Sequence, residues 1–180
     1  MTGVQTCALP ILIFLSGIHG AGKSYLCNDL NKYNISTYSA SHLIAEYKKE
    51  TYTPNKLTND IDGNQYALIK AINSLNDVNQ YVLDGHLCLL NGETKISRIN
   101  SDVIIQLNPQ MILNKVSDPS EIFKRLKQRD NKKYNINFLE SFQNEEIQYA
   151  RELSEILKIK LLTIDDDFKI DEIVKIIRRV

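Results

Sequence analysis

The chain has 180 residues, of which 43% are hydrophobic and 24% charged, and its 22 basic side chains balance 22 acidic ones. This composition is typical of a globular domain and excludes disordered and fibrous proteins. The charge balance argues against a polybasic surface, and the nine tyrosines are dispersed along the chain, so we expect no nucleic-acid partner.

Membrane spans and disulfides are not expected either. The longest apolar run, residues 8–18, is interrupted by Pro10 and Ser16 and falls short of the ~20 residues that cross a bilayer. The three cysteines, Cys7, Cys27 and Cys88, are too scattered for a disulfide framework or a zinc site. We therefore expect a cytoplasmic protein without a membrane partner; the sequence specifies no oligomeric state.

The first eleven residues, MTGVQTCALPI, have neither charge nor amphipathic period. They resemble the translation of a sequencing-adapter oligonucleotide, so we interpret residues 1–11 as a non-native N-terminal segment; the alternative is a genuine N-terminal arm. We expect residues 12–180 to form a single domain.

Short apolar runs alternate with stretches of helical spacing along the chain. In chain order these predict strand 11–17, helix 24–33, strand 35–40, helix 42–49 with Ser41 as its N-cap, helix 59–75, strand 81–83, strand 111–116, helix 120–130, helix 138–157, strand 160–164 and helix 170–179. Asn91-Gly92 within 87–99 indicates a hairpin flap. Periodicity does not decide which of the apolar runs 103–107 and 111–116, separated by Pro109, is a strand and which a short helix; we favour the second as the strand. The alternation predicts a three-layer α/β/α fold with a five-stranded parallel sheet.

One motif carries chemistry. Residues 17–24 match the pattern G-x-x-x-x-G-K-[ST] of a P-loop, or Walker A motif, and lie between a predicted strand and a predicted helix. The glycines let backbone N–H groups point into one concavity at a helix N-terminus, where phosphate oxygens bind. The alternative is an ordinary glycine turn. The residues expected to contact ATP are Gly17, His19, Gly20, Ala21, Gly22, Lys23, Ser24 and Tyr25.

Within this motif Lys23 is expected to bridge the β- and γ-phosphates, and the Ser24 hydroxyl to ligate Mg²⁺. Asp84 follows a buried strand, where a carboxylate can hold the same Mg²⁺ through water; alternatively, Asp84-Gly85 is a simple turn. The run 114–117, Asn-Lys-Val-Ser, lacks the aspartate that reads guanine, which disfavours a GTPase. A small phosphotransferase remains.

With residues 17–24, 82–85 and Arg125-x-x-x-Arg129-Asp130 in this order, the chain resembles the adenylate-kinase-like nucleotide and small-molecule kinases, small ATP-binding proteins of AAA type, over residues 12–180. The resemblance implies an acceptor-binding helical segment at 42–76 and a helical lid at 123–138. It also implies that Arg125 and Arg129 close on the transferring phosphoryl group.

Spacing supports this role, because side chains at i and i+4 share one helical face. The alternatives are a solvated face or a salt link between Arg125 and Asp130. Arg151, on the long helix after the lid, is a weaker candidate for the same phosphates.

The chain also departs from the family. Residues 40–75 contain no arginine, which puts a phosphorylated acceptor in doubt. His86 either orients the acceptor hydroxyl, accepts its proton or is a structural hydrogen-bonder. The run Asp165–Asp167 is interpreted as a solvated turn before the last helix.

We therefore expect an ATP- and Mg²⁺-dependent kinase that moves the γ-phosphoryl group to a small acceptor, such as a nucleoside, a nucleotide or a related metabolite. Its predicted catalytic residues are Lys23, Asp84, Arg125 and Arg129, and its predicted metal ligands are Ser24 and Asp84. The alternative is an ATP-binding regulatory switch or NTPase module without a small-molecule acceptor.

Overall fold

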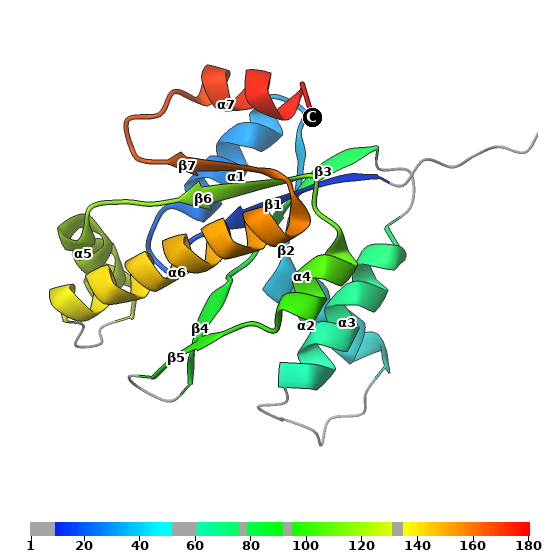
Figure 1. Ribbon diagram of the computed structural model, residues 1–180, viewed down its shortest axis with the longest axis horizontal. Helices are drawn as coiled ribbons and strands as arrows, with labels where there is room; N and C mark the ends of the chain where they lie inside the picture. The colour runs from blue at the N-terminus through cyan, green and yellow to red at the C-terminus, as the bar shows by residue number, and fades with distance from the viewer. Residues whose placement is uncertain (1–9, 52–60, 76–78, 92–94, 131–134) are drawn as a thin grey trace, which may run out of the picture.

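A five-stranded parallel sheet forms the centre of the molecule (Figure 1). The computed structural model describes residues 10–51, 61–75, 79–91, 95–130 and 135–180. The strands follow the spatial order β2-β3-β1-β6-β7. Their bounds are β1 Ile11–Ser16, β2 Ser36–Ser39, β3 Gln80–Asp84, β6 Met111–Lys115 and β7 Lys160–Ile164. The predicted sheet is confirmed, and so is the choice of the run after Pro109 as a strand.

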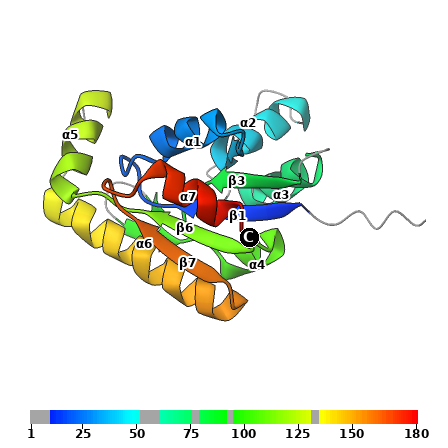
Figure 2. The same cartoon turned by 90° about the horizontal axis from the view of Figure 1, so that it is seen from above.

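Helices cover both faces of the sheet, which makes three layers (Figure 2). Helices α1 (Lys23–Lys32) and α7 (Ile170–Ile177) pack on one face. Helices α3 (Ile61–Asn73), α4 (Ser101–Leu107) and α6 (Ile136–Leu157) pack on the other. The predicted three-layer α/β/α class is confirmed. No helix in the described ranges has the length and apolarity needed to span a bilayer.

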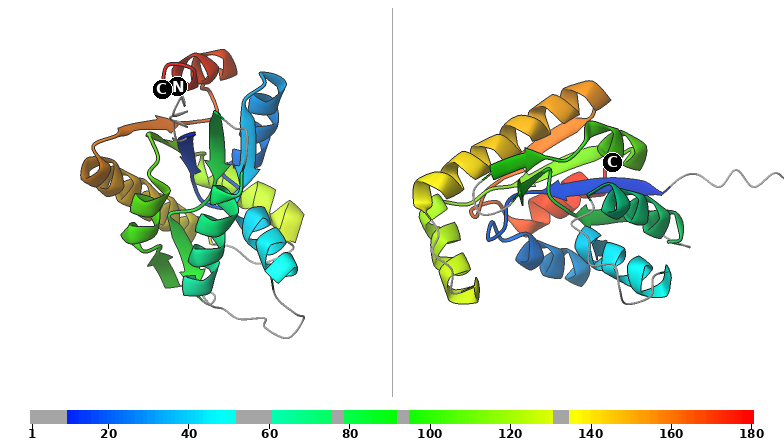
Figure 3. Two further views of the ribbon diagram at one scale, coloured as in Figure 1. Left: turned by 90° about the vertical axis from the view of Figure 1, so that its right-hand side faces the viewer. Right: turned by 90° about the horizontal axis from the view of Figure 1, so that it is seen from below.

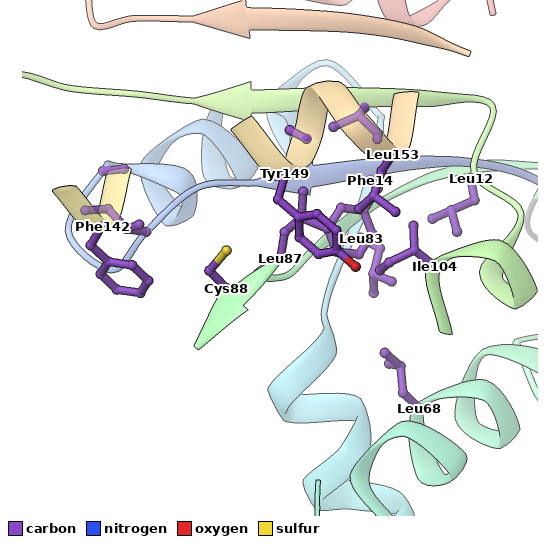
Figure 4. Close-up of a cluster of buried hydrophobic side chains, with 14 of the residues drawn as sticks. Leu12, Phe14, Leu68, Leu83, Leu87, Cys88, Ile104, Phe142, Tyr149 and Leu153 are labelled. Atoms are coloured by element: carbon purple, nitrogen blue, oxygen red, sulfur yellow. The ribbon is translucent and has the colours of Figure 1, made fainter. Parts of the chain in front are cut away.

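The alternation of side chains along β1 explains the two layers. Leu12 and Phe14 join the core beneath α3, α4 and α6, whereas Ile13 and Leu15 join the core beneath α1 and α7. All four are at most 2% exposed, so the strand is buried on both faces, as its unbroken apolar run predicts. Figure 4 shows the first cluster, in which Tyr149 and Leu153 of α6 lie against the sheet.

Two helices lie outside these layers. Helix α2 (Ala40–Thr51) packs against α3, and the two lie side by side in Figure 3. Helix α5 (Pro119–Asp130) follows β6 at the carboxyl edge of the sheet and packs against α6. The sequence of residues 131–135 predicts a polar break after α5; residues 131–134 lie outside the described residues, and Asn135 is the N-cap of α6.

The predicted hairpin is present as two antiparallel strands, β4 (Cys88–Asn91) and β5 (Lys95–Arg98), which form a separate sheet. Its turn, residues 92–94, lies outside the described residues, as do residues 1–9 of the segment interpreted as non-native. Tyr149 of α6 donates a 2.6 Å hydrogen bond to the carbonyl of Ile99, just after the hairpin. This contact helps to hold the hairpin's base against the domain.

The observed starts of α1, α2, α4, α5 and α6 each precede the predicted ones by one or two residues, and α2 and α5 show the cause. Helix α2 begins at Ala40, so Ser41 lies inside it rather than capping it, and its hydroxyl shares a 3.0 Å hydrogen bond with that of Ser39. Helix α5 begins at Pro119, and the Asp118 carboxylate accepts from the Ser120 N–H at 2.8 Å. Helix α5 thus starts one residue earlier than predicted. Proline suits the first helical position, because the N–H that it lacks would have no partner within the helix.

Candidate functional site

The P-loop connects β1 to α1 and requires glycine at defined positions. Gly17 has φ 141°, and a Cβ there would lie 2.4 Å from the Lys115 carbonyl oxygen. Gly22 has φ 97° and immediately precedes α1. Side chains at these positions would strain the backbone or collide with β6. The local sequence therefore produces a tight loop whose amides lead into a helix N-terminus.

Lys23 begins α1, and its ammonium folds back over the loop. Its side chain is 6% exposed, and its Nζ donates to the Gly17 carbonyl at 2.6 Å and to the Ile18 carbonyl at 3.4 Å. Burial lowers the pKa of Lys23, while the charges of Asp84 and Glu146 act in the opposite direction. The Lys23 ammonium therefore lies within the P-loop, close to the carboxylates of Asp84 and Glu146.

Asp84 ends β3 beside the P-loop, because β3 pairs with β1 in a register that places Asp84 opposite Leu15. Its Oδ1 lies 3.7 Å from the Lys23 Nζ. Burial raises the pKa of Asp84, and Lys23 lowers it. Asp84 and the exposed Ser24 line one cavity together with Lys23, so the structure brings the two predicted metal ligands to the same place.

His86 is held as a neutral imidazole. Its Nδ1 lies 2.8 Å from the Gly17 carbonyl, which can only accept, and 3.4 Å from the Lys23 Nζ, which can only donate; the shorter contact assigns the proton to Nδ1 and leaves the lone pair on Nε2. Burial, followed by the nearby charge of Lys23, lowers the pKa of His86 well below its usual value. The His86 and His19 rings lie 4.0 Å apart between centroids, although His19 itself is exposed. His86 therefore serves at least as a structural partner of the P-loop.

Glu146 is a site residue that the sequence analysis missed. This fully buried carboxylate of α6 accepts from the N–H of Gly17 at 2.9 Å, of Leu87 at 2.9 Å and of Cys88 at 2.7 Å. Burial raises its pKa, against the effect of these three donors. One carboxylate thus joins the start of the P-loop to the segment after Asp84.

A sequence signal for Glu146 exists in hindsight. It falls at core spacing between Leu139, Phe142 and Leu153 on α6, where a charge is out of place unless it has partners. Gln143, one turn earlier, is similarly buried, and its side chain bonds both the N–H and the carbonyl of Ser117.

Arg125 points toward the P-loop rather than solvent. Its guanidinium donates to the Gly20 carbonyl at 3.2 Å, to the Ser117 hydroxyl at 3.1 Å and to Asp166 at 3.1 Å. Asp166 also accepts from Lys115 at 2.6 Å. Arg125 is thus ion-paired with Asp166, a partner that the sequence analysis did not consider, while the side chain of Asp130, the partner that it did consider, lies outside the described residues.

Residues Asp165–Asp167 form the exposed turn that was predicted, but Asp166 is also held in place by Lys115, Ser117 and Arg125. Desolvation raises the pKa of Asp166, but hydrogen bonds from Lys115 and Ser117 outweigh it and lower the pKa to about 2. Asp165 and Asp167 are exposed and form a turn, with the Asp165 carboxylate accepting from the Asp167 N–H.

The remaining predicted residues lie around this centre. Arg129 is exposed one turn after Arg125, and its charge contributes to lowering the pKa of His86, which places it on the P-loop side of α5. Tyr25 is 78% exposed at the start of α1. Arg151 is exposed on α6 and lines neither cavity described below, so the structure does not bring it to the site.

Two cavities flank the P-loop. The first, about 320 Å³, lies between the carboxyl edge of the sheet and helices α2, α3 and α4, and Lys23 and Ser24 line it. The second, about 400 Å³, lies between α1, α5 and the loop after β7, and Gly22 and Tyr25 line it. Arg125, Lys115 and Asp166 line the second cavity as well.

Comparison with known proteins agrees with this geometry. A family model described as "AAA domain" matches residues 16–143, well over half of the chain. Shikimate kinase from Acinetobacter baumannii, solved in complex with shikimate, has a similar fold with a TM-score of 0.58 and 14% identity, covering 95% of this chain and 92% of that one. TT1252 from Thermus thermophilus gives a TM-score of 0.57 at 11% identity, covering 94% and 97%.

At such identities the likeness concerns the fold alone, and no curated protein matches the chain by sequence. The match to the family model covers the P-loop, β3 and α5, the segments on which the resemblance to P-loop kinases was based. The chain therefore belongs to the AAA domain family and has the fold of a P-loop kinase-like NTPase.

Proposed function

We propose that this protein is an ATP- and Mg²⁺-dependent phosphotransferase that moves the γ-phosphoryl group of ATP to a small acceptor. The observation that carries the proposal is the position of the P-loop between two cavities, with Lys23 at the first and Gly22 at the second. Hydrolysis needs a site for one substrate, whereas transfer needs sites for two substrates whose reacting ends meet.

In this proposal the nucleoside end of ATP occupies the second cavity, and the phosphates lie along the P-loop amides toward the first. Arg125 borders the second cavity and already contacts the Gly20 carbonyl, so it is placed beside the bound nucleotide. Lys23 exchanges its contact with the Gly17 carbonyl for the β- and γ-phosphate oxygens. Arg129 approaches the γ-phosphoryl group from α5.

The donor set fits Mg²⁺, because a hydroxyl and a carboxylate, from Ser24 and Asp84, line the cavity next to the phosphate cradle. Bound there, the ion would neutralise charge on the phosphate oxygens. The protein's own residues would do the rest: Lys23 and the arginines stabilise the negative charge that spreads over the γ-phosphoryl oxygens in the transition state.

Transfer forms a bond between the acceptor hydroxyl oxygen and the γ-phosphorus while the bond from the γ-phosphorus to the β,γ-bridging oxygen breaks, so that ADP leaves with that oxygen. The hydroxyl proton is lost to Asp84 or to the lone pair of His86 Nε2, the two acceptors on this side of the loop. The neutral state of His86 keeps that lone pair available near pH 7.

The test is Lys23→Met compared with Lys32→Met, the same change at an exposed position of the same helix. ADP release is measured with Mg²⁺–ATP in the presence and absence of each member of an acceptor panel. We expect Lys23→Met to lose acceptor-dependent turnover by at least ~100-fold, while Lys32→Met keeps it. Undiminished turnover by folded Lys23→Met protein would refute the proposal.

A further inference from the structure

The lining of the first cavity indicates the class of acceptor, an inference that rests on the proposed function. We infer that the acceptor is an uncharged small molecule with an apolar or planar body and a hydroxyl- or amide-rich end, as in a nucleoside, and that it carries no phosphate or carboxylate group.

The first step of the argument concerns charge. Among the described residues that line this cavity, the ionic side chains are Lys23 and Asp84, 3.7 Å apart, and the third titratable group, His86, is neutral. The proposed function assigns Lys23 to the phosphates of ATP. An anionic acceptor would thus bring its charge next to Asp84 with no other lining cation to pair it, and an unpaired anion removed from water is strongly disfavoured.

The second step concerns shape. Apolar side chains from β1, α2, α3, β4 and α4 form much of the cavity wall. The residues that form it include Phe14, Ile44, Leu68, Leu89, Val103 and Ile104. Its volume of about 320 Å³ is that of a small-molecule site. Such a wall favours a ring or another apolar body, because a fully hydrated polar molecule would gain nothing from it.

The third step concerns the polar end. Ser39, Ser41, Asn64 and Gln65 also line the cavity, and all four are uncharged donors and acceptors. The hydroxyls of Ser39 and Ser41 already share one hydrogen bond, in which either can be the donor, so the hydroxyl hydrogen that this bond does not use is available to a ligand.

Asn64 is oriented by its neighbour. Its Oδ1 accepts from the Lys48 ammonium at 2.5 Å, which leaves the amide N–H₂ as the group to offer a ligand. Lys48 does not itself line the cavity, because its ammonium bonds Asn64. Hydroxyl and amide groups on the acceptor match these uncharged donors and acceptors of the cavity, which would recognise them by hydrogen bonds rather than by charge.

The experiment compares pairs of related acceptors, one uncharged and one that carries an anionic group. ADP formation is followed with Mg²⁺–ATP and purine or pyrimidine nucleosides, each beside its 5′-monophosphate, and with cyclic polyols beside their carboxylates. We expect kcat/KM for the preferred uncharged probe to exceed that for its charged partner by on the order of 100-fold.

Gln65→Arg supplies the cation that the lining lacks, and Gln106→Arg adds the same charge at an exposed position of α4. We expect Gln65→Arg to shift the ratio of kcat/KM values at least ~10-fold toward the charged probe, and Gln106→Arg to leave the ratio unchanged. An unchanged ratio in folded Gln65→Arg protein, or an equal shift in Gln106→Arg, overturns the inference.

The outcomes separate the two proposals. Preference of the wild-type protein for phosphorylated or carboxylated probes overturns the acceptor class but leaves phosphotransfer intact. ADP formation with none of the probes, in protein that binds Mg²⁺–ATP by calorimetry, also overturns the acceptor class. Folded protein that does not bind Mg²⁺–ATP overturns the proposed function itself.

Discussion

Glu146 offers the sharpest test of how the site is held together. Its carboxylate accepts three backbone hydrogen bonds, two at Oε1 from Gly17 and Leu87 and one at Oε2 from Cys88. We predict that Glu146→Gln destabilises the fold and loosens the P-loop, although the side chain keeps its size. The reason is that a glutamine amide has one accepting oxygen and presents N–H groups where the second oxygen was.

The magnitude follows from counting donors. In its better orientation the glutamine carbonyl keeps the bonds from Gly17 and Leu87, and its N–H₂ then faces the Cys88 N–H. At least one buried N–H loses its acceptor, and the new amide lacks a partner. Each unsatisfied buried group costs about 1–3 kcal/mol, so for these two groups we expect a loss of about 2–6 kcal/mol in the free energy of unfolding.

Urea unfolding measures this loss, and hydrogen exchange reports where it arises. The amide protons of Gly17, Leu87 and Cys88 should exchange faster in Glu146→Gln than in the wild type. Glu140→Gln, the same change at an exposed position of α6, is the control, with an expected effect within about 0.5 kcal/mol. If Glu146→Gln unfolds at the wild-type urea concentration with unchanged exchange at these amides, the assignment is wrong.

Three further predictions concern other groups. Gly17→Ala should cost at least ~2 kcal/mol of stability by urea unfolding, because its Cβ would lie 2.4 Å from the Lys115 carbonyl oxygen at φ 141°; wild-type stability would contradict the described loop. The pKa of Asp166 is lowered to about 2 in the folded state, so its stabilising contribution is present above pH ~4 and is lost as the pH falls toward 2. Acid titration of Asp166→Asn should therefore lack that part of the wild-type decline, and identical acid profiles would disprove it. Burial raises the pKa of Cys27 and Cys88 to about 12, so peptides containing them should stay unlabelled by a thiol reagent at pH 8 in native protein and become labelled in urea, as mass spectrometry would show. Rapid labelling of the native protein would contradict their burial.

The fold was largely predictable because its signals are local. The apolar runs of β1, β3 and β6 are buried on both faces, which leaves little polar alternation and indicates a covered parallel sheet. The errors at Ser41 and Ser120 concern helix starts, where several neighbouring polar residues compete as caps. The strand order, with β6 and not β2 beside β1, is set by packing between distant segments.

The candidate site likewise has one part that the sequence predicted and another that it did not. The P-loop is eight contiguous residues, and its glycines and lysine follow from backbone angles and hydrogen bonds between near neighbours. The P-loop and its position between a strand and a helix could therefore be predicted from the local sequence. Glu146 reaches Gly17 across 129 positions, and Arg125 reaches Asp166 across 41. These contacts and the two cavities became visible in the folded structure alone, because they depend on how separate layers pack, and no motif in the sequence links these pairs of residues.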